Sequence, residues 1–144
     1  MALLSLLSRN VLAAGPLPTS PVRQDTTTER YADDLVGQDV SDRLYAARVL
    51  LRRVRTAWRV AGRKGDALQT IEARQTLANF DQLVAPRCIR QLAVRNVRIP
   101  CTQILGMLET KEAVPALQQV TLASLSSREH RIVLRTIRRI EGVQ

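Results

Sequence analysis

The spacing of apolar residues between positions 40 and 61 limits the possible folds of this chain more than any other feature. In the segment VSDRLYAARVLLRRVRTAWRVA they recur at alternating steps of four and three, at positions 40, 44, 47, 51, 54, 58 and 61. This spacing places them on one face of an α-helix. Asp39 or Ser41 can cap the start of the helix, and Gly62 can end it. Since Trp58 lies on the apolar face, we expect it in the core.

The rest of the chain after residue 64 also reads as helical. Apolar residues at helical spacing predict helices over 65–80, 81–94, 96–108, 111–125 and 126–142. The expected inward residues are 67, 68, 71, 77 and 80 in the first of these helices and 83, 84, 88, 92 and 93 in the second. Asp66, Asp81 and Ser126 or Ser127 are plausible N-caps, and Glu129 can complete a capping box.

A core without many aromatic rings favours the same fold class. Aromatic residues make up only 3% of the chain, so Leu, Val, Ile and Ala must fill the core. No segment shows convincing two-residue alternation. We therefore predict an all-α protein of about six helices joined by short turns.

The 144 residues are enough for one domain with a tail. We expect the helical domain over 39–142, a polar linker with at most a short helical turn over 25–38, and a flexible or cleaved segment over 1–24. That last segment resembles a secretory signal ending at Ala13, Ala14 and Gly15, and it is too short to span a bilayer. A transit peptide and a plain N-terminal helix remain alternatives. Export to an outer or periplasmic compartment is favoured, and cytoplasmic or organellar locations stay open.

Arginine dominates the charge of the chain. There are 20 Arg and 2 Lys against 7 Asp and 6 Glu, a formal net charge of +9. On two predicted helices the arginines recur at helical spacing, which makes two stripes: Arg48, Arg52, Arg55, Arg59 and Arg63 on the first, and Arg128, Arg131, Arg135 and Arg138 on the last. Such stripes either are solvated helix faces or bind an acidic partner, because a guanidinium group prefers a carboxylate or a phosphate.

Catalytic, metal and cofactor sites are hard to build from this sequence. His130 is the only histidine and lies in a predicted helix cap, where a surface role is expected. Cys88 and Cys101 show neither metal-ligand nor redox-motif spacing, and we expect buried thiols or, in an oxidising compartment, a disulfide. We predict a non-enzyme without metal or cofactor.

The stretch VRIPCTQILGMLETKEAVPALQQV, residues 97–120, suggests a repeat. Arg98 and Arg131, Cys101 and Leu134, and Ile104 and Ile137 share an offset of 33 residues. Gly106 would allow close packing at a helix end, and Pro115 would fall in the first turn of a helix, where it costs no hydrogen bond.

This stretch resembles a HEAT-like repeat of the short kind found in phycobilisome-linked lyases. The matching residues are Val97, Arg98, Cys101, Leu105, Gly106, Ala113, Val114, Pro115, Ala116 and Leu117. The resemblance is weak before residue 95. It implies a small α-solenoid of antiparallel helical hairpins that serves as a scaffold or a regulatory protein–protein interaction module. We expect a partner protein with an acidic face. The alternative is nucleic-acid binding through the phosphate backbone, although the few aromatic residues argue against reading of single strands or bases.

Overall fold

The structure is a computed structural model, and it describes residues 26–62, 68–123 and 125–143. The expectations for residues 1–24, for Arg63 and for the Asp66 cap lie outside this part. The elements are α2 (Thr26–Leu35), α3 (Val40–Ala61), α4 (Leu68–Leu83), α5 (Ala85–Gln91), α6 (Arg98–Leu108), the 3₁₀ helix η2 (Lys111–Ala113), α7 (Val114–Thr121) and α8 (Ser127–Glu141). No strand occurs in the described residues, so the all-α prediction is confirmed.

Helix α3 has the predicted bounds, but its buried face is rotated from the predicted one. Asp39 caps its start by accepting a hydrogen bond from the backbone N–H of Asp42 at 3.0 Å, and Gly62 ends it. The buried residues are Ala46, Ala47, Leu50, Leu51, Val54 and Ala57. The prediction for Trp58 is wrong, because this side chain is 42% exposed. The periodicity predicted the helix correctly, but the neighbours that pack on both sides of α3 determine which of its faces is buried.

The segment 25–38, expected as a linker, instead holds a packed helix. Thr28, Ala32 and Leu35 are buried along one side of α2 at steps of four and three, and the last two are fully buried. The Arg53 guanidinium of α3 donates a 2.8 Å hydrogen bond to the hydroxyl of Thr28. In the sequence, the many polar residues of α2 obscure a narrow apolar strip. This strip is sufficient for α2 to pack on α3.

Helices α4 and α5 also differ from prediction at particular residues. Leu68 and Ile71 are 69% and 50% exposed, whereas Thr70, Ala73 and Phe80 are buried, so the predicted inward face of α4 is wrong at its start. Asp81 lies within α4 and does not cap the next helix. Its carboxylate accepts a 3.0 Å hydrogen bond from the hydroxyl of Thr110, which connects α4 to the turn after α6.

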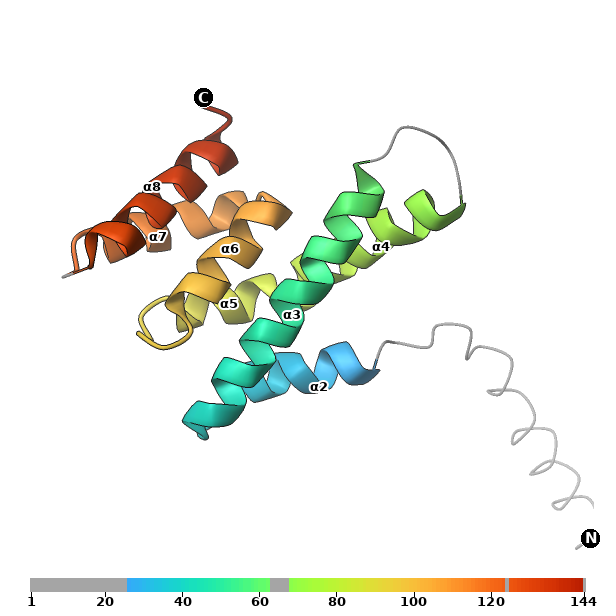
Figure 1. Ribbon diagram of the computed structural model, residues 1–144, viewed down its shortest axis with the longest axis horizontal. Helices are drawn as coiled ribbons and strands as arrows, with labels where there is room; N and C mark the ends of the chain where they lie inside the picture. Colours follow the sequence, from blue (N-terminus) through green and yellow to red (C-terminus); the bar gives the residue numbers. More distant parts are fainter. Residues whose placement is uncertain (1–25, 63–67, 124, 144) are drawn as a thin grey trace, which may run out of the picture.

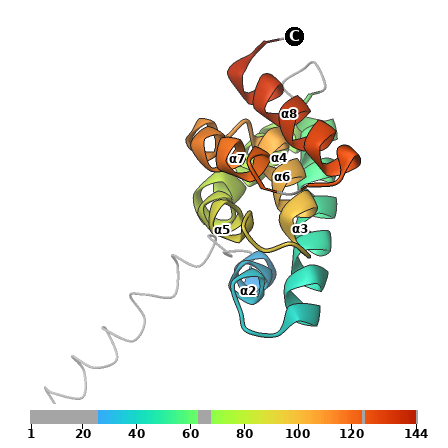
Figure 2. The ribbon, with the colours of Figure 1, turned by 90° about the vertical axis from the view of Figure 1, so that its left-hand side faces the viewer.

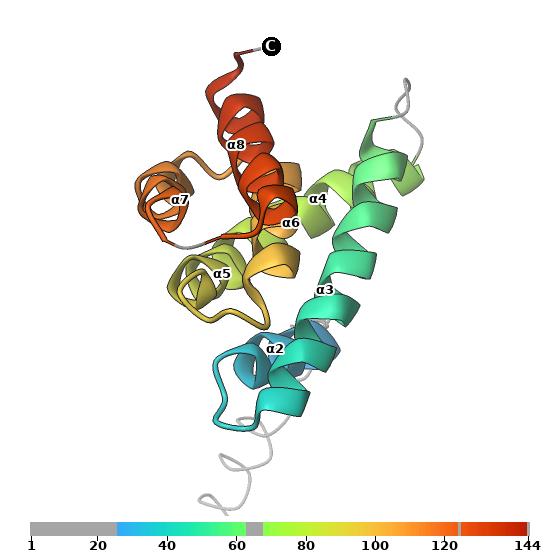
Figure 3. The ribbon, with the colours of Figure 1, turned by 60° about the vertical axis from the view of Figure 1, so that its left-hand side comes forward.

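The helices form two layers. Figures 1 and 3 show α3, α6 and α8 side by side in one layer, with α6 in the middle, and α2, α4, α5 and α7 behind them. The tertiary contacts agree, since α6 packs on both α3 and α8, and the pairs α2–α3, α5–α6 and α7–α8 pack across the layers. Figure 2 shows α2 and α8 at opposite ends of this arrangement. In the described part of the chain, no helix has the length and apolarity needed to cross a membrane.

The residues predicted to belong to a repeat motif lie in α6 and α7. Cys101, Leu105 and Leu117 are fully buried, whereas Val114 is half-buried at the start of α7. Pro115 lies in the first turn of α7, where its missing N–H removes no intrahelical bond. Arg98 is held at the start of α6, where its Nε donates a 2.8 Å hydrogen bond to the carbonyl of Leu92.

Gly106 provides the close approach that its place in the motif predicts. A Cβ atom added there would meet the Cγ2 methyl of Thr136 on α8 at 3.1 Å. Thr136 is itself fixed, because its hydroxyl donates a 2.9 Å hydrogen bond to the carbonyl of Ile132. The absence of a side chain at Gly106 therefore sets how closely α6 and α8 pack.

Candidate binding surface on α3 and α8

Helix α8 carries most of the candidate surface, and a capping box fixes where it begins. The hydroxyl of Ser126 accepts a hydrogen bond from the backbone N–H of Glu129 at 3.2 Å, and the Glu129 carboxylate accepts one from the N–H of Ser126 at 3.1 Å. These hydrogen bonds lower the pKa of Glu129 from its ordinary value. The cap sets the register of the helix, so that Val133, Ile137 and Ile140 face the core.

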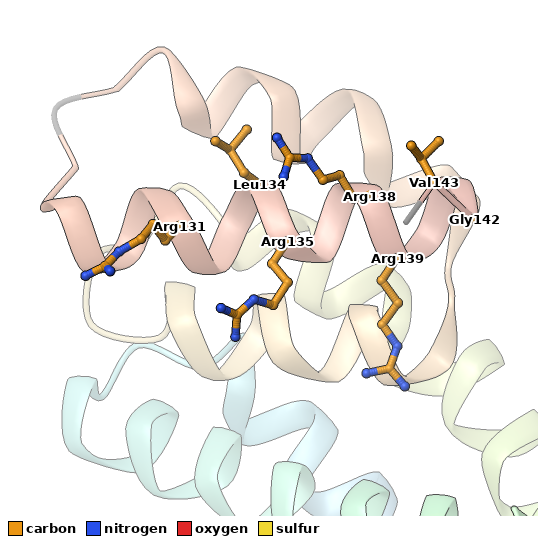
Figure 4. Close-up of a pocket in the computed structure, with 7 residues that line it drawn as sticks. All are labelled: Arg131, Leu134, Arg135, Arg138, Arg139, Gly142 and Val143. Carbon is orange, nitrogen blue, oxygen red and sulfur yellow. The ribbon is translucent and has the colours of Figure 1, made fainter.

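The opposite face of α8 is a row of arginines. We call it the α8 arginine row, and all of its members are exposed: Arg128, Arg131, Arg135, Arg138 and Arg139. Four of them were predicted from their spacing, whereas Arg139 was missed. In Figure 4, Arg135 and Arg139 extend from one side of the helix, and Leu134, Arg138 and Val143 extend from the other. The row is therefore two-sided rather than a single line.

The arginines of α3 form a second exposed row. Arg48, Arg52, Arg55 and Arg59 are all exposed and lie away from the buried face of the helix, as predicted. We call them the α3 arginine row. Between Arg43 and the end of α3 at Ala61 no acidic residue interrupts it. Both rows therefore belong to the layer of α3, α6 and α8.

One side-chain contact joins the two rows. The guanidinium carbon of Arg139 lies 5.0 Å from the centroid of the Trp58 ring, which is a cation–π geometry. Trp58 stands in the last turn of α3, next to Arg59 and one turn after Arg55. No pattern within either helix could reveal this contact, because it depends on how α3 and α8 pack on α6. The sequence showed only that Arg139 follows Arg135 by four residues, which is a helical spacing.

The guanidinium groups of the α8 arginine row have no acidic partner within the described residues. The ion pair between Arg87 and Asp33, at 3.1 Å, lies elsewhere, between α5 and α2. Arg131 donates a long 3.4 Å hydrogen bond from Nε to the carbonyl of Ser127, and Arg139 lies on Trp58. Like charges at these helical spacings repel by a few tenths of a kcal/mol per pair, so bound anions would relieve a real cost.

A shallow hollow of about 760 Å³ lies over the C-terminal half of α8. It is lined by Arg131, Leu134, Arg135, Arg138, Arg139, Gly142 and Val143 (Figure 4). All of these residues come from α8 and its end, so the hollow is the space between long side chains and not an enclosed cavity. Its lining combines guanidinium groups with the apolar side chains of Leu134 and Val143. A surface of this shape suits an extended macromolecular partner better than an enclosed small molecule.

The two cysteines and the histidine complete the candidate chemical groups. Cys88 of α5 and Cys101 of α6 are fully buried free thiols. The hydrogen bond with Cys101 and then burial raise the pKa of the Cys88 thiol well above its ordinary value, so it stays protonated. His130 is exposed on α8. No group of three or more His, Cys, Asp or Glu residues that could hold a metal ion occurs within 26–62, 68–123 and 125–143.

Comparison of the chain with known proteins adds no relative. No family model, no curated protein and no solved structure matches it. The function is therefore inferred from the chemistry of the described residues.

Proposed function

We propose that this protein is a non-catalytic binding module that holds an acidic face of a partner protein on the α3 and α8 arginine rows. The observation that carries the proposal is the α8 arginine row, which is exposed, lacks carboxylate partners among the described residues and meets the α3 row at Trp58. Guanidinium groups bind carboxylates in a bidentate fork, which gives geometric specificity as well as attraction.

We further propose that the layers are a short HEAT-like solenoid. The pairs α2–α3, α5–α6 and α7–α8 would be its hairpins, and α3, α6 and α8 would form one continuous face. Stacked helix pairs of this kind expose an extended surface on which a partner can lie across several helices. The interpretation is supported by Gly106, where α6 and α8 approach closely, and by Pro115, which lies in the first turn of α7 as the resemblance implies.

Nucleic-acid binding is the competing function, favoured by the net charge of +9 and by guanidinium groups that could neutralise phosphates. The two functions differ in their salt dependence. A protein that makes several phosphate contacts on duplex nucleic acid loses orders of magnitude in affinity between about 50 and 200 mM salt. If duplex binding is weak at 50 mM salt, or does not change over this range, the competing function is excluded.

The test of the proposed function uses two charge-reversal variants. Arg52→Glu/Arg55→Glu/Arg59→Glu reverses the charge of three of the four residues of the α3 row, and Arg135→Glu/Arg138→Glu reverses the charge at the centre of the α8 row. Each should abolish binding to an immobilised glutamate-rich polypeptide while the circular dichroism spectrum stays helical. The matched control is Arg74→Glu/Arg90→Glu, which changes exposed arginines on α4 and α5. Full binding by both row variants would disprove the proposal.

A further inference from the structure

We infer that Trp58 is the anchor of this surface, and that the partner is an acidic polypeptide segment carrying an apolar side chain that docks on the indole ring. This inference rests on the proposed function. It names a residue and a ligand chemistry that the arginine rows alone do not specify.

Trp58 lies at the surface although its spacing predicted a place in the core. It belongs to the apolar pattern of α3, yet it is 42% exposed, whereas its neighbour Ala57 is only 7% exposed. Trp58 is also the sole tryptophan of the chain. A large aromatic ring that stays half-exposed within an otherwise charged surface resembles the aromatic anchors that dominate protein–protein interfaces.

The surroundings of the ring are cationic. Arg139 covers it from α8 at 5.0 Å, and the exposed Arg55 lies one helical turn before Trp58 on the same side of α3. An apolar side chain placed on the indole would therefore have guanidinium groups around it. Acidic residues next to that side chain could pair with those groups at the same time.

The cover over the ring can be displaced. An exposed cation–π contact is weak. An apolar side chain that docks on the indole removes apolar surface of both groups from water, so it competes with Arg139 for the ring. The released Arg139 gains a carboxylate from the partner in exchange. The phosphate backbone of a duplex offers charge but no such side chain, so the site favours acidic polypeptide over duplex nucleic acid.

The experiment compares two synthetic peptides of equal length and equal negative charge, both rich in glutamate. One carries leucine at positions where the other carries serine. The wild-type protein should bind the leucine peptide about tenfold more tightly. The leucine peptide alone should shift the fluorescence of Trp58 to shorter wavelength, since it removes water from the indole. In the Trp58→Ala variant the preference should vanish, while the affinity for the serine peptide stays unchanged.

The outcomes separate this inference from the proposed function. Equal affinity for both peptides in the wild type, or a preference that persists in Trp58→Ala, overturns the anchor and leaves the arginine rows intact. Tighter binding of duplex nucleic acid than of the leucine peptide at 150 mM salt, about physiological ionic strength, overturns the ligand class. Unchanged binding of both peptides by both arginine-row variants overturns the proposed function itself.

A second variant guards against loss of folding in Trp58→Ala. Arg139→Ala uncovers the ring without touching the core, because Arg139 is exposed. In the free variant, quenching of Trp58 fluorescence by acrylamide should increase, and addition of the leucine peptide should suppress it. If the peptide binds without protecting the indole, Trp58 is not the anchor.

Discussion

At the scale of single residues, the contact of Gly106 with Thr136 shows how a small side chain controls helix packing. A glycine inside a helix costs about 0.5–1 kcal/mol relative to alanine, so its presence in α6 requires a compensating gain. That gain is the close approach of α8, where a Cβ atom would lie 3.1 Å from the Thr136 methyl group. Such a contact is tighter than most contacts of real Cβ atoms, so Thr136 would have to shift by a few tenths of an ångström.

We predict that Gly106→Ala destabilises the protein by about 1 kcal/mol, since overpacking at a fixed neighbour outweighs the better helix propensity. The Thr136 methyl cannot rotate freely, because the hydroxyl on the same carbon is bonded to the carbonyl of Ile132. Urea denaturation measures the effect. The control is Gly106→Ala in a Thr136→Ser background, which removes the methyl and should abolish the penalty. An equal penalty in both backgrounds would refute this explanation.

The two cysteines give a second prediction at this scale. Because Cys88 and Cys101 are fully buried and the pKa of Cys88 is raised, neither should react readily in the folded protein. A colorimetric thiol reagent at pH 8 should label both on the order of a hundredfold more slowly than in denaturant, at a rate set by opening of the fold. Rapid labelling of the native protein would show that α5 and α6 are not packed as described.

At the scale of elements, the capping box decides the stability of α8 and hence the presentation of its arginine row. Ser126→Ala removes the side-chain acceptor for the N–H of Glu129 and should cost about 1 kcal/mol, as loss of an N-cap usually does. Thermal unfolding followed by circular dichroism measures it. Ser127→Ala, one residue later in the first turn, is the matched control and should have little effect.

Glu129 adds a pH dependence of known sign to α8. The pKa of Glu129 is lowered in the folded protein. Its carboxylate therefore stabilises the fold at pH values above the unfolded-state pKa near 4.5, and this stabilisation is lost as the pH falls through the folded-state pKa. Glu129→Gln keeps an acceptor in the box but does not titrate. The stability difference between wild type and Glu129→Gln should therefore shrink between pH 6 and pH 3, as melting temperatures over that range can show. A constant difference contradicts the role of the carboxylate.

The sequence predicted which segments are helical better than it predicted which faces are buried. Periodic apolar spacing and caps placed α3 and α8 correctly, because those signals are local. The apolar strip of α2 was too narrow to notice among its Thr, Glu and Asp residues. Leu68 and Ile71 were assigned to the core because apolar residues usually are buried, but Thr70 and Ala73 are the buried residues in this part of α4. The choice of face depends on neighbours that are distant in sequence.

The candidate surface was predictable in the same partial way. The spacing of the arginines gave both rows, since exposure on a helix follows from distance to the apolar face. The contact of Arg139 with Trp58 could not be predicted, because it requires the relative placement of α3 and α8.

At the scale of the whole molecule, the net charge of +9 acts on stability as well as on binding. The exposed rows repel within and between α3 and α8, and salt screens such repulsion over about 10 Å at 0.1 M ionic strength. We predict that the melting temperature rises by a few degrees between about 0.02 and 0.2 M sodium chloride. Arg135→Glu/Arg138→Glu should show a smaller rise. A fall in melting temperature with salt would mean that favourable ion pairs dominate instead.

The central place of α6 between α3 and α8 has a consequence for local opening. Helix α6 packs on α3, α5 and α8, whereas α7 packs mainly on α8 and η2 at one end of the layers. Amide hydrogens of Ile104 and Leu105 can exchange with deuterium only when neighbours on both sides separate, so they should be the slowest in the chain. Those of α7 should exchange earlier, by detachment of the α7–α8 end while the α2–α3 end stays closed.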